Sequence, residues 1–195
     1  RSCGEREVER VLSLGRLPLV NALVEPGSAE PDDRYPLDVV RCPRCTLVQI
    51  TETVAPETLF RHYSYFSSYS DTMLDHARRF ASQAIGELGL DGDSLVVEAA
   101  SNDGYLLRFF VEQGVPVLGI EPAENVADAA RAEGIETVSE FLDEPLARRL
   151  VAERGTADLV VANNVLAHVP DLHGFVGALR TLAGANVARE IRDPQ

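Results

Sequence analysis

Residues 95–110, LVVEAASNDGYLLRFF, contain the stretch that decides the fold. Residues 95–99 are a short apolar run rich in valine, which is typical of a buried strand, and residues 104–113 have the apolar spacing of a helix. The turn between them reads Ser-Asn-Asp-Gly. A strand, a tight turn and a helix in this order predict the opening of a βαβ unit.

The same alternation continues along the rest of the chain. We predict strands over residues 115–120, 136–138 and 157–162, and helices over residues 125–133, 142–154 and 172–182. Alternating strands and helices indicate an α/β fold with a parallel sheet and right-handed crossovers. We expect a domain over residues 91–195 that is incomplete at its C-terminus, because a sheet of four strands would leave its last edge uncovered.

Acidic side chains stand at the ends of the first two predicted strands. In open α/β sheets the ligand binds beyond the C-terminal ends of the strands, which here carry Glu98, Asp103, Gly104 and Glu121. A carboxylate at Glu121 suits the two hydroxyls of a ribose. We include Ser101, Asn102 and Pro122, which adjoin these residues, among the expected cofactor contacts.

The composition of the first turn separates the possible cofactors. A dinucleotide pyrophosphate favours a glycine-rich G-x-G-x-x-G turn, and Asp103 would repel it, so an NAD-dependent dehydrogenase is disfavoured. S-adenosylmethionine carries a sulfonium, an ammonium and a ribose, and it fits an acidic turn. The alternative is that Glu98 and Asp103 are ordinary strand-end and helix-capping residues.

A further set of polar residues follows the strand predicted at residues 157–162. Asn163 ends this strand and is placed to touch the cofactor, and His168 follows in a loop. A histidine there can take or give a proton near neutral pH. The alternative is a structural hydrogen bonder.

Residues 1–55 form a predicted small module that holds all three cysteines. We expect two short extended segments around a loop at residues 24–36. Cys42 and Cys45 form a C-x-x-C knuckle that Cys3 can join, which predicts a zinc site with one ligand missing. A cysteine immediately before Arg1 would complete the site, and His62 or His76 are weaker alternatives. The cysteines could otherwise be buried apolar residues or a redox pair.

Residues 56–90 form a predicted helical and aromatic connector. Ala55, Pro56 and Glu57 open a helical turn, and the pair Ser70-Asp71 can cap a helix over residues 72–87. Between them the sequence HYSYFSSYS carries Tyr63, Tyr65 and Tyr69. This stretch can be a core stripe or the wall of a sugar pocket.

Composition narrows the class of partners. The 195-residue chain has a net charge of −13 and a pI near 4.7, which disfavours nucleic acid and anionic membranes as partners. The sequence contains neither an apolar run that could cross a bilayer nor a signal-peptide core, so we expect a cytoplasmic protein. Its cysteines should be reduced thiols or metal ligands and not disulfides. The sequence makes no prediction of an oligomeric state.

Six stretches together resemble the sugar C-methyltransferases of deoxysugar biosynthesis. They are LGRLPLVNALV, YPLDVVRCPRCTLVQI, HYSYFSSYS, VVEAASNDGYLLRFF, LGIEPAENVADAA and NNVLAHVPDLHGFV. The resemblance runs from Cys3 to about Leu182. It implies a zinc-binding module, a partial Rossmann-like domain that binds S-adenosylmethionine, and a C-terminal sugar-binding domain that is missing here.

The resemblance also implies roles for individual residues. It places zinc on Cys3, Cys42 and Cys45 and assigns the active-site histidine to His168. It assigns the active-site tyrosine to Tyr65, with Tyr63 and Tyr69 as competing positions. The implied reaction methylates a ring carbon of a nucleotide-linked 4-keto deoxysugar through an enolate that attacks the methyl group. The alternative is a truncated, non-catalytic binding module that retains the zinc and cofactor sites. We expect the chain alone to bind S-adenosylmethionine weakly and to show no detectable methyl transfer.

Overall fold

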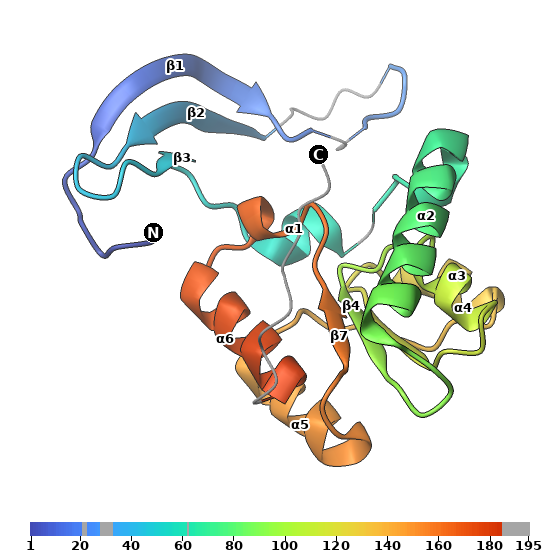
Figure 1. Ribbon diagram of the computed structural model, residues 1–195. Helices are drawn as coiled ribbons and strands as arrows, with labels where there is room; N and C mark the ends of the chain where they lie inside the picture. The colour runs from blue at the N-terminus through green and yellow to red at the C-terminus, as the bar shows by residue number, and fades with distance from the viewer. Residues whose placement is uncertain (21–22, 28–32, 62, 185–195) are drawn as a thin grey trace.

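The computed structural model describes residues 1–20, 23–27, 33–61 and 63–184, and these form two parts. A small antiparallel sheet comes first, and an α/β part follows it, as Figure 1 shows. The connecting segment carries helix α1 (Pro56–Phe60) and the 3-10 helix η1 (Ser67–Tyr69). The carbonyl of Ser2 lies 2.6 Å from Nε2 of His173, so the start of the chain also contacts the α/β part.

The small sheet has three strands in the order β1-β2-β3: β1 (Glu9–Pro18), β2 (Arg34–Arg41) and β3 (Val48–Ile50). The prediction of two extended segments around a loop is confirmed by β1 and β2, but the predicted end of the loop at residue 36 and the number of strands were wrong. A third strand is present, and β2 begins inside the predicted loop. Pro36 is tolerated in β2 because β3 pairs only with Val39 to Arg41, so no third strand lies opposite the proline.

The helix that precedes the larger sheet begins where the sequence predicts. Helix α2 (Asp71–Leu88) follows Ser70, whose hydroxyl accepts a hydrogen bond from the backbone N–H of Met73, as an N-cap residue should. It ends at Gly89, which adopts the left-handed conformation common after helices. The predicted bounds of this helix, 72–87, are confirmed to within one residue at each end.

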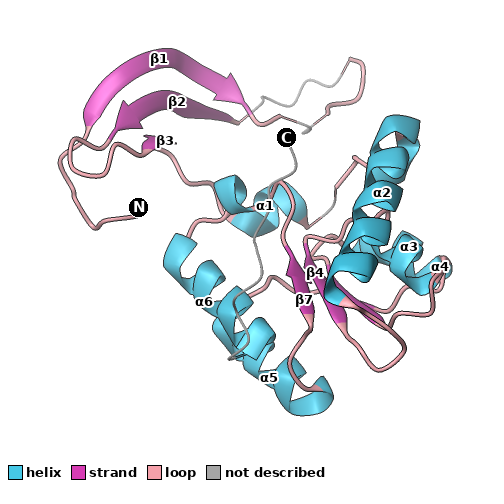
Figure 2. Cartoon of the chain, viewed as in Figure 1, coloured by secondary structure: helices cyan, strands magenta, loops and turns pink. Residues whose placement is uncertain are grey.

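The larger sheet is parallel and has the strand order β6-β5-β4-β7. Its strands are β4 (Val96–Ala99), β5 (Val117–Ile120), β6 (Thr137–Val138) and β7 (Leu159–Val161). The helices are α3 (Leu107–Val111), α4 (Glu124–Ala132), α5 (Glu144–Arg154) and α6 (Leu172–Ala183), with the 3-10 helix η2 (Leu166–His168) before α6. The predicted α/β fold with a parallel sheet is confirmed (Figure 2).

Helix α3 is shorter than the helix predicted over residues 104–113. Ala100 and Asn102 have φ angles of 57° and 51°, so the chain makes tight turns after β4 and becomes helical only at Leu107. The apolar residues that predicted the helix are buried as expected, but those before Leu107 lie in a turn and not in the helix. Leu106 and Leu107 are fully buried there.

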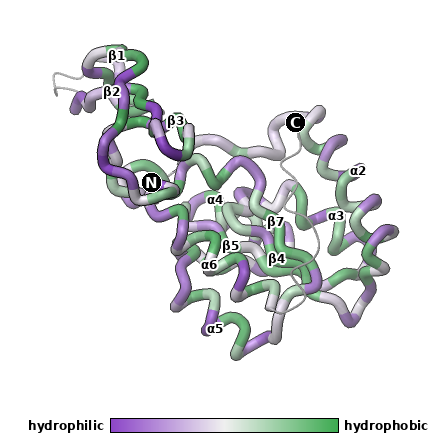
Figure 3. Tube along the Cα trace, turned by 60° about the vertical axis from the view of Figure 1, so that its left-hand side comes forward, coloured by the Kyte–Doolittle hydropathy of each residue, from purple (hydrophilic) through white to green (hydrophobic). Residues whose placement is uncertain are grey.

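Helices cover both faces of the larger sheet. Val96 packs on the side of α2 and α3, with Ala77 and Phe110, whereas its neighbour Val97 packs on the side of α5 and α6, with Leu146. Figure 3 shows the apolar residues that run along β4 and β5 between these layers. The chain adds β5 and β6 on one side of β4 and then crosses to β7 on the other, so the strand order reverses beside β4. Ligands of open α/β sheets bind at such a position.

None of the helices in the described part of the chain is long and apolar enough to span a membrane.

Candidate functional site

The turn after β4 brings the predicted cofactor residues to the C-terminal edge of the sheet. Gly104 is needed in this turn for two reasons: its φ is +74°, and a Cβ atom there would collide with the side chain of Ile135. Gly119 in β5 also needs its small size, since a Cβ would lie 2.6 Å from Oγ of Ser101. The backbone of the turn is thereby packed closely against β5.

Three carboxyl groups are buried together at this edge. The exposed fractions are 0% for Glu98, 4% for Asp103 and 6% for Glu121. Burial raises the pKa of Glu98 well above its ordinary value, and the neighbouring charges of Glu121 and Asp103 add to the rise, against the opposing influence of the Tyr105 hydroxyl. Burial likewise raises the pKa of Glu121, although two backbone N–H groups oppose this. The cluster therefore favours a positively charged neighbour.

Several buried polar atoms near these carboxyl groups have no hydrogen-bond partner of normal geometry among the described residues. They are both carboxyl oxygens of Glu98, Oγ of Ser101, Oδ1 of Asp103 and Oδ1 of Asn163. A buried acceptor without a partner costs about 1–3 kcal/mol. Nearly all of these atoms are acceptors, so a ligand that supplies N–H or O–H donors would satisfy them.

Glu121 has a different role within the cluster. Its two carboxyl oxygens accept hydrogen bonds from the backbone N–H groups of Asn102 and Ala123, at 3.0 and 2.9 Å. These bonds tie the end of β5 to the turn after β4 and fix the direction of the carboxylate. The adjoining Pro122 is half-buried in the same segment.

The end of β7 contributes Asn163, whose Nδ2 lies 3.4 Å from the hydroxyl of Tyr105. These two residues line a cavity of ≈ 300 Å³ together with Met73, His76 and Asn164. The cavity therefore lies between helix α2, the start of α3 and the end of β7. The structure brings Asn163 to the side of the turn that holds the acids.

The two predicted catalytic residues lie outside the buried cluster. Tyr65 is 48% exposed and precedes η1, and His168 is exposed at the end of η2 instead of in an open loop. Aromatic contacts connect them: the ring of Phe60 lies 6.2 Å from that of His168 and 5.9 Å from that of Tyr63, which in turn lies 6.4 Å from that of Tyr65.

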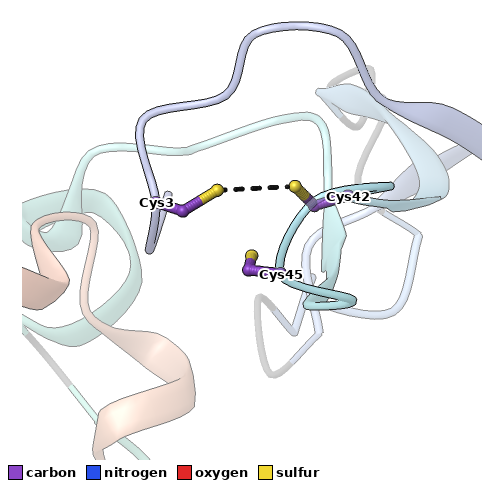
Figure 4. Close-up of side chains that lie close together, drawn as sticks. All are labelled: Cys3, Cys42 and Cys45. Carbon is purple, nitrogen blue, oxygen red and sulfur yellow. Dashed lines mark hydrogen bonds between the residues drawn. The ribbon is translucent and has the colours of Figure 1, made fainter.

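The three cysteines come together on loops beside the small sheet, and their sulfur atoms all lie within 4.8 Å of one another (Figure 4). The Cys3 and Cys42 sulfurs are 3.6 Å apart. Two sulfurs on one tetrahedral zinc, each about 2.3 Å from the metal, stand roughly 3.8 Å apart. The three cysteines therefore have the spacing and the ligand type of a zinc site.

Backbone N–H groups of the loop favour the thiolate form of Cys42, which is the form that binds a metal. The N–H groups of Cys45 and Arg44 lower the pKa of Cys42 to about 7, against the effect of burial. Thr46, with a φ of 64°, closes the knuckle, and its N–H donates to the carbonyl of Cys42 at 3.0 Å. A thiolate at Cys42 is thus stabilised by the loop that carries it.

Two histidines were considered as alternatives for the fourth zinc ligand. His76 lies on α2 and lines the cavity beside Tyr105, away from the cysteine group, so this alternative was wrong. His62 lies outside the described residues.

Sequence reasoning missed Tyr105 and Asn125. Tyr105 is only 7% exposed and its hydroxyl stands between Glu98 and Asn163, a role that its place directly after Asp103-Gly104 could have suggested. Asn125 bonds the backbone of Tyr63, 62 residues away in the chain, and no local pattern points to that contact.

Family comparisons agree with this division of the chain. Residues 1–60 match a family described as "Putative zinc binding domain", and residues 73–195 match one described as "Methyltransferase domain". C-methyltransferase NovU from Streptomyces niveus is 33% identical over 183 residues, which are 93% of this chain and 44% of that protein. The chain thus spans less than half the length of the curated relative that it matches.

Similarity to solved structures is weaker. Magnesium protoporphyrin IX methyltransferase from Synechocystis is 18% identical with a TM-score of 0.44, over 62% of this chain and 60% of that one. A methyltransferase from Anabaena variabilis is 17% identical with a TM-score of 0.45, over 68% and 63%. The assignment rests instead on the family match, which covers more than half of the chain. This chain belongs to the methyltransferase-domain family and carries ahead of that domain the cysteine-containing zinc-binding domain.

Proposed function

We propose that this chain is the cofactor-binding part of an S-adenosylmethionine-dependent C-methyltransferase that acts on a nucleotide-linked 4-keto deoxysugar. One observation carries the cofactor assignment. Glu98, Asp103 and Asn163 present buried acceptor atoms without partners at the C-terminal edge of the sheet. A cationic ligand with ammonium and hydroxyl donors satisfies them, whereas a pyrophosphate would be repelled.

Each part of the cofactor has a matching group in this cluster. Glu121 would accept the ribose hydroxyls through the lone pairs that its two backbone bonds leave available. Asp103 would accept from the ammonium through Oδ1, the oxygen without a partner. Ser101 and Gly104 shape the turn around it, and Asn163 closes the side near β7.

The fully buried carboxyl of Glu98 would act mainly through its charge. Its raised pKa keeps it protonated over a wider pH range when no cation is near. A bound cation would favour the ionised form. Binding of the cofactor is thus coupled to the protonation of Glu98.

The substrate part of the proposal rests on the relative named as a C-methyltransferase and on the resemblance of the aromatic segment. When bound, S-adenosylmethionine supplies an electrophilic methyl group. His168 is the candidate base that removes the proton from the carbon beside the ketone, and Tyr65 is the candidate contact to the sugar ring. Both are exposed, as groups that receive a separate substrate should be.

The zinc-binding domain has a structural role in this proposal. Its cysteines lie on loops beside the small sheet, far along the chain from the acidic turn, and the metal would connect the N-terminus to the knuckle. We expect metal to stabilise this module and to take no part in methyl transfer. The domain bounds predicted from the sequence, 1–55, 56–90 and 91–195, remain part of the proposal.

Isothermal titration calorimetry of the 195-residue chain tests the cofactor assignment. We expect heat of binding with S-adenosylmethionine or S-adenosylhomocysteine and none with NAD, because only the first two carry an ammonium for Asp103. Heat with NAD alone would overturn the proposal.

A preparation that transfers methyl groups to a nucleotide 4-keto sugar tests the roles of the exposed residues. There we expect His168→Ala to lower the rate by roughly a hundredfold or more and to leave cofactor affinity nearly unchanged. A wild-type rate in this variant would remove His168 from the mechanism.

A further inference from the structure

Residues 63–68, which we name the strap, pass beside the acidic turn and the start of α4. The strap contains Tyr63 and Tyr65 and runs into η1. Its backbone is held by side chains from two elements that are distant in sequence. These contacts are independent of any ligand.

Asn125, in the first turn of α4, binds both backbone groups of one strap residue. Its Oδ1 accepts from the N–H of Tyr63 at 3.1 Å, and its Nδ2 donates to the carbonyl of Tyr63 at 2.6 Å. This is the exchange of bonds that a paired strand makes in an antiparallel sheet. Both contacts are half-buried, which strengthens them relative to exposed ones.

Asn102, in the turn after β4, repeats the arrangement further along the strap. Its Nδ2 donates to the carbonyl of Tyr65 at 3.1 Å, and its Oδ1 accepts from the N–H of Ser67 at 2.8 Å. Oδ2 of Asp103 accepts a further hydrogen bond from the N–H of Ser68 at 3.1 Å. Both polar atoms of the Asn102 side chain thus bond the strap.

Each asparagine is close in sequence to one of the proposed cofactor acids. Asn102 precedes Asp103, and Asn125 follows Glu121 at the entry to α4. Asp103 itself divides its oxygens, since Oδ2 binds the strap and Oδ1 has no partner among the described residues. A ligand bound at Oδ1 would therefore share one carboxyl group with the strap backbone.

We propose that Asn102 and Asn125 are positioning residues that fix the strap as one rigid unit, so that the cofactor-binding turn sets the place of Tyr63, Tyr65 and, through Phe60, the ring of His168. Asn102 then acts through its amide on the strap and not on the cofactor. The identity of the ligand rests on the proposed function above, but the rigid strap does not.

Hydrogen exchange of the 195-residue chain, followed by NMR at single amides, tests this inference without any ligand. The variant Asn125→Ala removes both bonds to Tyr63, and alanine preserves the helix α4. The amides of Ser67 and Ser68 bond only to Asn102 and Asp103, so they report on the strap at a distance from the substitution. We expect them to exchange roughly tenfold faster in the variant.

Two further variants make the result interpretable. Asp128→Asn lies on the same helix and removes only an exposed ion pair with Arg131, so it should leave both amides at the wild-type rate. Asn125→Asp keeps the acceptor for the Tyr63 N–H but loses the donor, and it replaces Asn125→Ala if that variant fails to fold. Unchanged exchange at Ser67 and Ser68, or a change confined to Tyr63, would overturn the inference.

The tyrosine signal in near-ultraviolet circular dichroism provides a second readout. The chain has five tyrosines and no tryptophan, and the ring pairs of the strap contribute to this signal. We expect Asn125→Ala to reduce the signal while the thermal transition of the sheet stays in place. S-adenosylhomocysteine affinity, measured in parallel, separates the proposals: if the wild type does not bind it, the proposed function fails while the exchange rates still decide the strap.

Discussion

Strands β1 and β4 show how differently the two parts of this chain are stabilised. Every residue of β1 is exposed, including Val11 and Leu14, whereas every residue of β4 is buried, including the acid Glu98. The α/β part therefore owes its stability to buried apolar area, of which each fully buried Val or Leu contributes about 1.5–3 kcal/mol. The small sheet has almost no such area, and we expect it to depend on a metal held by the cysteine cluster.

The contrast also concerns polar groups. Where the core is dense, the sheet can bury three carboxyl groups and several atoms without partners, at an energetic cost that the packing offsets. The small sheet, whose strand β1 is exposed, lacks the buried packing that could offset such a cost. We therefore propose that the buried acids mark a binding site and that the cysteines mark a structural one.

Removal of metal should give the largest difference between the two parts. In a chain with a cysteine added before Arg1 and loaded with zinc, a chelator should increase proteolysis within residues 9–41 by roughly a hundredfold, because the metal supplies most of the stability of the module. The sheet of β4 to β7 should stay resistant. Cys42→Ser without chelator should reproduce the effect, and equal resistance with and without zinc would contradict it.

The turn after β4 offers a second, smaller test. Gly104→Ala should lower the melting temperature by roughly 5–10 °C, because it adds a clash with Ile135 to the strain of a positive φ. Gly114→Ala is a matched control, since Gly114 has a φ of +78° and no atom within 4 Å of the added Cβ. Its effect should be no more than about half as large. Equal shifts in a thermal melt would show that the close packing of the turn is unimportant.

The smallest effect concerns Glu98 and pH. Its pKa is raised in the folded protein above the ordinary value of 4.5, so the folded state holds this proton more tightly than the unfolded chain. Stability is undiminished below pH 4.5 and falls as the pH rises from there through the folded-state pKa. Glu98→Gln removes this loss.

Thermal melts of wild type and Glu98→Gln at two pH values check this prediction. The variant should melt roughly 2–5 °C higher than wild type at pH 8 and at about the same temperature at pH 4. A variant that is less stable at pH 8 would mean that Glu98 stabilises the apo fold.

Local sequence pattern predicted most of the α/β part. Short apolar runs identified β4, β5 and β7 because strands buried on both faces have few alternatives, and Ser70 identified the start of α2 because a capping bond is local. The pattern misplaced the start of α3, where Asn102 has a positive φ and its side chain bonds the strap. Spacing cannot report such long-range contacts.

The same limit decided which residues of the candidate site could be predicted from the sequence. Glu98, Asp103 and Glu121 were accessible to sequence reasoning because parallel strands bring their C-terminal ends to one edge. Asn125 was not, because its partner Tyr63 lies in a segment without regular structure. In the small sheet, β3 was missed since three residues are too few to show alternation.

The central claim is that the buried acids, and not the cysteine module, form the cofactor site, and the affinity for S-adenosylhomocysteine in two variants tests it most directly. By calorimetry at pH 7.5, Asp103→Asn should weaken binding at least roughly thirtyfold, since it removes a charge-assisted bond to the ammonium. Cys42→Ser should stay within about threefold of wild type, because that sulfur lies in the other part of the molecule. Full affinity in Asp103→Asn, or a loss in Cys42→Ser as large as in Asp103→Asn, would contradict the account.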